Sequence, residues 1–281
     1  MAVRASKQLS AGELEALAAL EARAVGADGG RLKLEWGALR SRPGHAPRDF
    51  TWWEQDTLLG FAGLYAFNTA KVEIAGMVDP GARRRGIASA LLDAALTVCR
   101  EHGGESVLLV VPRNSPGGRQ LALGRGAQLE HSEHAMVLRC SPPPAPANPA
   151  LSLRAADLPD LEVLSELMLA GFGHPLSGPE ELLPTERSQT LVAEYRGRVA
   201  GTVRLSRDGD RGGVYGFTIA PQLRGQGIGR EVLSRVCREL LSSGMREVGL
   251  EVAVDNDHAL GLYRSVGFTP LATEDYYELG L

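Results

Sequence analysis

An internal repeat of 141 residues constrains this chain more than any other feature of its sequence. A Pro-x-x-Arg-x-x-Gly-x-Gly/Ala pattern occurs twice, and a later glycine keeps the same spacing. Chance does not readily hold such a register, so the sequence predicts two copies of one fold. The matched positions are Pro80, Arg83, Gly86, Ala88 and Gly126 with Pro221, Arg224, Gly227, Gly229 and Gly267, and Asn114 with Asn256 at a spacing of 142.

A proline-rich segment, residues 141–149, separates the two copies. Prolines lack the backbone N–H and favour polyproline II, which makes a semi-rigid spacer. We therefore expect one domain at 1–140, a linker at 141–149 and a second domain at 150–281. Hydrophobic periodicity predicts an α/β (α+β) fold in which each copy has a mixed sheet flanked by helices.

The expected elements follow the same order in both copies. Apolar residues at three-to-four spacing indicate helices, and short β-branched or alternating runs indicate strands. The expected helices are 10–24, 31–42, 83–102, 157–169, 178–187 and 228–244. The expected strands are 50–53, 58–67, 71–78, 107–111, 151–154, 190–195, 199–206, 214–219 and 248–254.

The turn Arg224–Gly229 lies between an expected strand and an expected helix. Its glycines let successive N–H groups point into one concavity, and the helix N-terminus adds partial positive charge. Such a turn is an anion site of a size that suits a pyrophosphate. A Walker loop would need Gly-Lys-Ser/Thr, and a dinucleotide fingerprint would need a third glycine where Arg230 stands, so neither pattern fits.

The form Arg/Gln-x-x-Gly-x-Gly/Ala resembles the acetyl-CoA-binding motif of the GNAT acetyltransferase superfamily. The resemblance implies a mixed, twisted sheet that opens between its fourth and fifth strands, with acetyl-CoA in the gap. The implied cofactor-binding residues are Thr218, Ile219, Arg224, Gly225, Gln226, Gly227, Ile228 and Gly229 in the second copy, and Arg83, Arg84, Arg85, Gly86, Ile87 and Ala88 in the first.

The stretch 250–268 resembles the second GNAT signature, and its Leu-Glu-Val-x-x-x-Asn lead-in is similar to the ribosomal-protein N-terminal acetyltransferases. In that branch the strand glutamate, here Glu251, is the base, acting directly or through water. Tyr263 is the candidate acid for the leaving thiol. Asn256 is expected either to bind the pantetheine arm or to cap the helix. The alternatives are a solvated carboxylate for Glu251 and a core aromatic for Tyr263.

The implied reaction is direct transfer of acetyl to a primary amine. The ammonium must lose a proton before it attacks the thioester, and the backbone N–H of Ile219 is placed as the oxyanion donor. Direct attack needs no covalent enzyme intermediate, which agrees with the absence of a Ser-His-Asp or Cys-His signature.

The first copy departs from this pattern. Pairing Asn114 with Asn256 places Leu109 where Glu251 stands, and the tyrosine position falls on Leu121 or Ala122. A leucine neither accepts nor donates a proton, so we expect the first copy to be structural or regulatory, with its phosphate turn still able to hold acetyl-CoA. The three consecutive arginines Arg83–Arg85 could form a nucleic-acid-binding patch, but their place at an expected phosphate turn explains them without nucleic acid.

Charge and composition narrow the expected partners. The first 140 residues carry 17 basic and 15 acidic side chains and the rest carry 13 and 19, so net charges of +2 and −6 sum to −4. An acidic catalytic half favours amine-bearing acceptors and argues against nucleic acid. No apolar run is long enough to span a membrane, and the three cysteines form no metal pattern and favour the reducing cytoplasm.

The acceptor is left open by the sequence. The tandem architecture is similar to that of the mycothiol synthase family, whose acceptor is the cysteinyl amine of a pseudodisaccharide, so this is one alternative. A non-catalytic acetyl-CoA sensor or interaction module is another. We expect either a monomer whose two halves form an intramolecular pseudo-dimer, or a homodimer.

Overall fold

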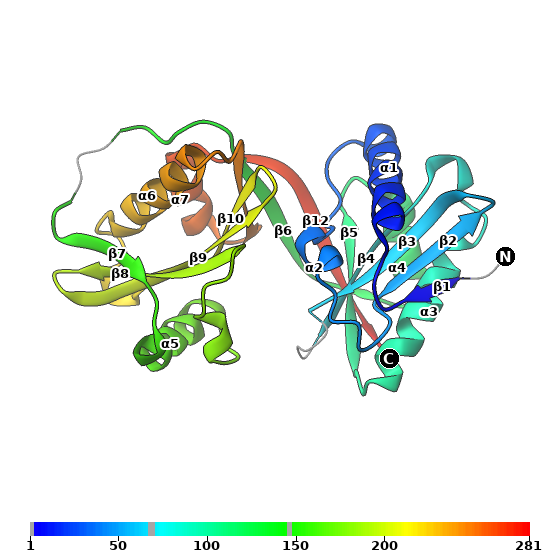
Figure 1. Cartoon of the computed structure of the whole chain (residues 1–281), viewed down its shortest axis with the longest axis horizontal. Helices are drawn as coiled ribbons and strands as arrows, with labels where there is room; N and C mark the ends of the chain where they lie inside the picture. The colour runs from blue at the N-terminus through cyan, green and yellow to red at the C-terminus, as the bar shows by residue number, and fades with distance from the viewer. Residues whose placement is uncertain (1–2, 67–70, 145–147) are drawn as a thin grey trace. The chain divides into compact units, whose positions relative to one another are not determined.

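The computed structural model of the chain describes residues 3–66, 71–144 and 148–281. Its backbone divides into two compact units, Met1–His134 with Leu271–Leu281 (unit 1) and Ala135–Pro270 (unit 2). Each unit combines a mixed sheet with helices, as the sequence predicts (Figure 1). Residues 145–147 of the expected linker lie outside the described residues.

Unit 1 contains a sheet with helices on both faces. Helix α1 begins after Ser10, whose side chain and Glu13 form a capping box. Leu17, Leu20 and Ala24 of α1 pack on one face of the sheet, and α3 packs on the other. The elements are β1 (Arg4–Ser6), α1 (Ala11–Asp28), α2 (Trp36–Arg40), β2 (Asp49–Glu54), β3 (Thr57–Tyr65), β4 (Val72–Val78), α3 (Ile87–Glu101), β5 (Ser106–Pro112), α4 (Pro116–Gly124) and β6 (Gln128–Leu138).

Unit 2 repeats this order. Helices α6 and α7 share one buried cluster with the sheet, and α5 packs in another. Figure 1 shows α6 and α7 on one side of the strands and α5 on the other. The elements are β7 (Leu151–Ala155), α5 (Leu161–Phe172), β8 (Ser188–Tyr195), β9 (Arg198–Asp208), β10 (Arg211–Ile219), α6 (Ile228–Ser242), β11 (Glu247–Ala253) and α7 (Asp257–Val266). One more strand, β12 (Thr269–Gly280), follows them in the chain.

The final strand of the chain completes unit 1, not unit 2. Residues Glu274–Gly280 of β12 pair antiparallel with Pro112–Ser106 of β5. Conversely, Met136 and Leu138 at the end of β6 are buried in the core of unit 2. The strand order is β1-β2-β3-β4-β5-β12-β6-β11-β10-β9-β8-β7. The expected boundary at the proline-rich segment therefore differs from the observed division, because sheet pairing and not the linker assigns the last strand of each copy.

Two expected helices differ from the structure. Residues 178–187 form only a 3₁₀ turn, Pro179–Glu181, because Pro184 cannot continue a helix. The helix expected at 31–42 is reduced to α2. The residues before it follow Gly29 and Gly30, both at positive φ, and form a loop. The expectation that a strand runs to residue 67 reaches beyond the described residues.

The sheet of each unit opens between its parallel strands. In unit 1 the β4–β5 pairing covers Val72–Ala75 and Val107–Val110, and in unit 2 the β10–β11 pairing covers Arg211–Gly213 and Glu247–Gly249. Beyond these residues the strands are no longer paired, which leaves a gap at their carboxyl ends. Within the described ranges, no helix is long and apolar enough to cross a bilayer.

Candidate active site

The glycine-rich turn of unit 2 has the backbone of an anion site. Gly225 and Gly227 have φ of 76° and 81°, a left-handed conformation that strains any residue with a Cβ. Gly227 is the N-cap of α6, whose first residue, Ile228, is buried in the core and fixes the helix start. The free N–H groups of a helix N-terminus therefore face the turn, as the sequence predicts.

The turn of unit 1 has the same backbone conformation. Gly86 has φ of 81° and caps α3, and Arg84 takes the left-handed conformation at φ of 64° where unit 2 has Gly225. An arginine at positive φ is uncommon. Unit 1 thus keeps the shape of the turn although it has Arg84 where unit 2 has Gly225.

One arginine in each turn bonds back to the preceding strand. Arg224 Nε donates to the carbonyl oxygen of Ile219 at 2.9 Å. Arg83 Nε donates to the carbonyl oxygen of Val78 at 3.3 Å. Both bonds span five residues, so Val78 and Ile219 are equivalent and the repeat spacing is 141 here.

The same spacing holds through the next strand and helix, and it corrects one pairing. Helix α4 is capped by Ser115, which accepts from Gly118 N, and α7 is capped by Asn256, which accepts from Ala259 N at 3.1 Å. Ser115 and not Asn114 is therefore the counterpart of Asn256, since 256 minus 115 is 141. The apparent asparagine match at 142 was wrong by one residue.

The corrected register changes which unit 1 residues are equivalent to the candidate base and acid of unit 2. Val110, not Leu109, occupies the place of Glu251, and Ala122 that of Tyr263. The sheet faces support this register. Val110 packs in the cluster beneath α1, whereas Leu109 packs beneath α3. Leu250 and Val252 pack beneath α6, so alternation directs Glu251 to the other face. Each aliphatic replacement still removes an ionisable group from unit 1.

Strand β10 carries an irregularity beside the gap. Its pairing with β9 shifts between Tyr215 and Thr218, where three steps along β10 match two along β9, and Gly216 has φ of 51°. This is a β-bulge, a feature that re-aims groups next to active sites. The described β3–β4 ladder of unit 1, from Gly60–Val78 to Tyr65–Glu73, contains no such shift.

The N–H of Ile219 points into the gap. Ala220 N donates to Ala200 O at 2.8 Å, so Ala220 faces β9. Successive N–H groups along a strand alternate in direction, and that of Ile219 therefore faces the side from which β11 has diverged. The side chain of Thr218 is buried beside Gly171 of α5. The geometry suits the oxyanion role expected for Ile219.

The two candidate catalytic side chains lie on opposite faces of the sheet. Tyr263 on α7 is 8% exposed and packs edge-to-face against Phe268, with ring centroids 6.1 Å apart. Burial raises the pKa of Tyr263 to about 12, so its hydroxyl remains protonated at neutral pH and can donate a proton. Glu251 is partly exposed on β11. Tyr263 therefore lies on the face covered by α6 and α7, and Glu251 on the opposite face.

The remaining sequence-predicted residues have clear local roles. Asn256 is the N-cap of α7, so the capping alternative is observed, and contact with pantetheine stays a prediction. Gln226 Nε2 donates to Gln222 O at 3.2 Å within the turn. A side chain on Gly229 would meet Ile219 and Leu262 at ordinary contact distances, 3.4 and 3.5 Å. The buried thiols of Cys99 and Cys237 have pKa values raised by burial to about 11 and about 12, which does not suit a nucleophile.

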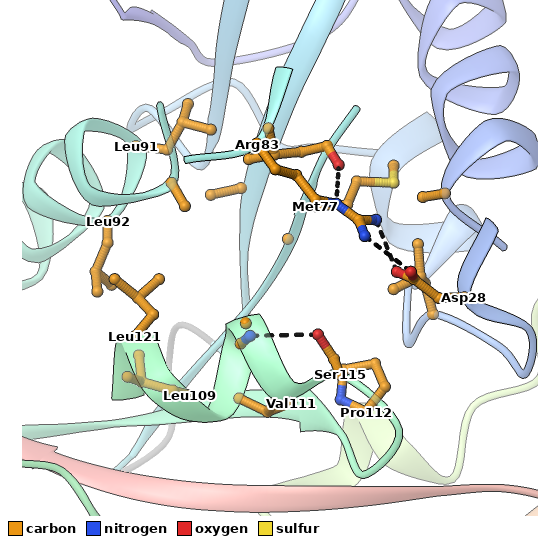
Figure 2. Close-up of a pocket in the computed structure, with 18 of the residues that line it drawn as sticks. Asp28, Met77, Arg83, Leu91, Leu92, Leu109, Val111, Pro112, Ser115 and Leu121 are labelled. Carbon is orange, nitrogen blue, oxygen red and sulfur yellow. Dashed lines mark hydrogen bonds and ion pairs between the residues drawn. The ribbon is translucent and has the colours of Figure 1, made fainter. Parts of the chain in front are cut away.

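A cavity of about 610 Å³ occupies the gap of unit 1 (Figure 2). Its lining includes the turn residues Gly86, Ile87 and Ala88 and the β5 residues Leu109–Pro112. Leu91, Leu92, Leu109 and Leu121 gather on one side of it in Figure 2, and Asp28 and Arg83 lie on the other. Unit 1 thus has room for a ligand although it lacks the ionisable pair.

The three arginines of the unit 1 turn all have partners. Arg83 pairs with both carboxylate oxygens of Asp28 at 2.8 and 2.7 Å, and this bonding raises its pKa. Arg84 donates to Gln120 at 2.7 Å, and Arg85 pairs with Glu54. Asp28, at the end of α1, was not foreseen. Asp28 is 55 residues from Arg83 in the sequence, and the packing of α1 brings the two side chains together.

Comparison with known proteins identifies the class that this fold and site define. The Acetyltransferase (GNAT) family matches residues 16–121 and again 161–268, which is most of the chain. The protein therefore belongs to the GNAT family and is an acetyltransferase with two tandem copies of the fold. Enzymes of this family use acetyl-CoA.

Among particular proteins, the chain is similar to mycothiol acetyltransferases. It is 31% identical to that of Thermobispora bispora over 304 aligned positions, covering 99% of both chains, and 32% identical to that of Clavibacter sepedonicus, covering 77% of this chain and 75% of the relative. The fold resembles a GCN5-related N-acetyltransferase from Sphaerobacter thermophilus, with TM-score 0.79 and 21% identity over 99% of this chain and 95% of that one. A tandem GNAT protein from the clavulanic acid biosynthesis pathway has TM-score 0.69, 19% identity and coverage of 99% and 98%.

Proposed function

We propose that unit 2 transfers acetyl from acetyl-CoA to a primary amine of a small molecule or peptide by direct attack. One observation carries this assignment: at equivalent places, unit 2 has Glu251, Tyr263 and a bulged strand, whereas unit 1 has Val110, Ala122 and a regular strand. Proton transfer needs the ionisable side chains, and valine and alanine supply none.

In the proposed mechanism the Arg224–Gly229 turn holds the pyrophosphate of acetyl-CoA and the thioester lies in the gap between β10 and β11. Glu251 removes a proton from the acceptor ammonium, directly or through water. The neutral amine attacks the carbonyl carbon, and Ile219 N–H stabilises the oxyanion. As the tetrahedral intermediate collapses, Tyr263 gives its proton to the departing thiolate.

The favoured acceptor is of the mycothiol type, a cysteine-bearing pseudodisaccharide whose free amine becomes acetylated. It is supported by 31% identity to a mycothiol acetyltransferase over 99% of both chains. Unit 2, residues 135–270, carries 14 basic and 16 acidic side chains, so its net charge of −2 is too small to favour a cationic acceptor as the sequence division suggested. We also propose that the turn of unit 1, Arg83–Ala88, binds a CoA thioester without turnover.

The decisive experiment measures thiol release from acetyl-CoA with a panel of amines that includes cysteinyl glycosides, simple amino sugars and N-terminal peptides. Glu251→Gln should lower kcat/KM and flatten the acidic limb of its pH profile, because that limb reports ionisation of the base. Glu247→Gln, on the same strand, is the matched control and should keep the wild-type limb. A wild-type profile in Glu251→Gln would remove Glu251 from the mechanism.

A further inference from the structure

The two replaced catalytic positions line the same cavity in unit 1. Val110 stands where Glu251 is in unit 2, and Ala122 where Tyr263 is, and both belong to the lining. The exposed fractions of Val110 and Ala122 are 6% and 1%. The thioester region of unit 1 therefore has aliphatic walls at both points where unit 2 has a proton-transfer group.

The cavity continues past Val110 onto the α1 face of the sheet. There it is lined by Ala24 and Val25 of α1, Phe61 of β3 and Met77 of β4. Ala24, Phe61 and Met77 are buried in the apolar cluster that includes Val110. In unit 2 this face, to which Glu251 turns, is where the amine acceptor would enter. In unit 1 it offers dispersion contacts and little to bind an ammonium group.

The loop after α1 is tied across this face by charged and polar contacts. The carboxylate of Asp28 accepts hydrogen bonds from Nη1 and Nη2 of Arg83, and Arg31 Nε lies 3.1 Å from Glu274 of β12. Asn114 Nδ2 donates to the carbonyl oxygens of Asp28 and Gly29, at 2.9 and 3.3 Å. The turn, the β5–α4 loop and β12 thus all hold the loop in place. An acceptor that must enter and leave repeatedly would have to displace it, whereas a bound acyl chain would not.

We infer that unit 1 binds a CoA thioester whose acyl chain is longer than acetyl, with the chain in the apolar space between α1, β3 and β4. The inference rests on the proposed binding of CoA at the unit 1 turn. Hydrophobic burial gives about 0.8 kcal/mol per methylene, so binding should tighten roughly fourfold for each methylene that fits, and roughly fifteenfold from acetyl to butyryl, which adds two methylenes.

The test is calorimetric titration of the full chain carrying Gly227→Asp, which leaves only unit 1 competent, with CoA, acetyl-CoA, butyryl-CoA and hexanoyl-CoA. The expected result is a stepwise gain in affinity with chain length. Val25→Phe, which fills the apolar space from a half-buried position of α1, should remove the gain and retain affinity for CoA. Ala22→Phe, exposed on the same helix and outside the cavity lining, is the matched control and should keep the gain.

Three outcomes separate the possibilities. A gain with chain length that Val25→Phe removes supports the inference. Binding of acetyl-CoA at least as tight as that of the longer thioesters overturns it and leaves CoA binding by unit 1 intact. No binding of any of these ligands to the Gly227→Asp chain, while a Gly86→Asp chain still binds acetyl-CoA, overturns the underlying proposal that unit 1 holds CoA.

Discussion

Arg224 Nε donates a hydrogen bond to the carbonyl oxygen of Ile219, 2.9 Å away, and so joins the glycine-rich turn of unit 2 to the end of strand β10. The bond fixes the turn relative to the residue whose N–H faces the gap. The same bond would fix the distance between a pyrophosphate bound at the turn and a thioester carbonyl bound at Ile219. This relationship is repeated in unit 1 by Arg83 and Val78.

Arg224→Ala should therefore weaken use of acetyl-CoA. A hydrogen bond from a charged donor contributes roughly 1.5–3 kcal/mol, part of which water recovers because Arg224 is exposed. We expect KM for acetyl-CoA to rise about tenfold with a smaller fall in kcat, measured by steady-state thiol release. Arg246→Ala, at an exposed position beyond α6, is the control and should leave both constants unchanged.

The same substitution in the two turns should have unequal effects. Gly227→Asp forces a side chain into φ of 81° and places a negative charge at the helix N-terminus where phosphate would bind. We expect acetyl transfer to be lost, at least a hundredfold. Gly86→Asp, at the same φ in unit 1, should leave kcat within about twofold.

Gly227→Ala separates backbone strain from charge in this comparison. It adds the strain of about 1–2 kcal/mol without the charge, so it should retain part of the activity. Activity that survives Gly227→Asp but disappears on Gly86→Asp would reverse the assignment of the catalytic unit.

Tyr263→Phe should lower kcat by roughly ten- to a thousandfold with little change in KM for acetyl-CoA, because only proton donation to the thiolate is lost. Tyr195→Phe in unit 2, at a strand end away from α7, is the control. A wild-type kcat in Tyr263→Phe would show that the buried ring is structural and that the thiolate takes its proton from water.

Tyr263 also predicts a stability change at alkaline pH. Burial raises its folded-state pKa to about 12, above the ordinary tyrosine value of about 10, so folding favours the protonated form. That contribution is complete below pH 10 and is lost between pH 10 and 12, by on the order of 2 kcal/mol. Thermal unfolding at pH 8 and pH 11 should show a smaller drop in midpoint for Tyr263→Phe than for the wild-type protein. Equal drops would contradict the buried, protonated state.

Cutting the chain within residues 141–149 should not separate it into independent halves. The first fragment keeps β6, whose end lies in the core of unit 2, and the second keeps β12, which pairs with β5 of unit 1. Fragments 1–144 and 148–281 should co-purify when expressed together. Expressed alone, fragment 148–281 should self-associate or aggregate, since it lacks β6 and has a β12 without its partner strand. A stable monomer of that fragment would contradict the exchange of strands.

Local chemistry made much of this protein readable from its sequence. Ser10 marks a helix start, and the glycines at 86, 225 and 227 mark the turns between strand and helix because left-handed φ favours residues without a Cβ. The 141-residue spacing predicted two copies of one fold, and Glu251 and Tyr263 were named from their motif. These features depend on neighbours a few residues apart, so a one-dimensional pattern contains them.

The tertiary structure decided what depends on distant partners. Whether β12 joins unit 1 or unit 2 is a matter of sheet pairing over more than 150 residues, and its own alternation fits either. The pairing of Val110 with Glu251 required the helix caps Ser115 and Asn256, because a chance asparagine at 114 shifted the apparent register by one. Asp28 meets Arg83 only through the packing of α1 beside the turn. The cavity likewise forms where two parallel strands diverge, and the sequence of either strand alone does not predict where they separate.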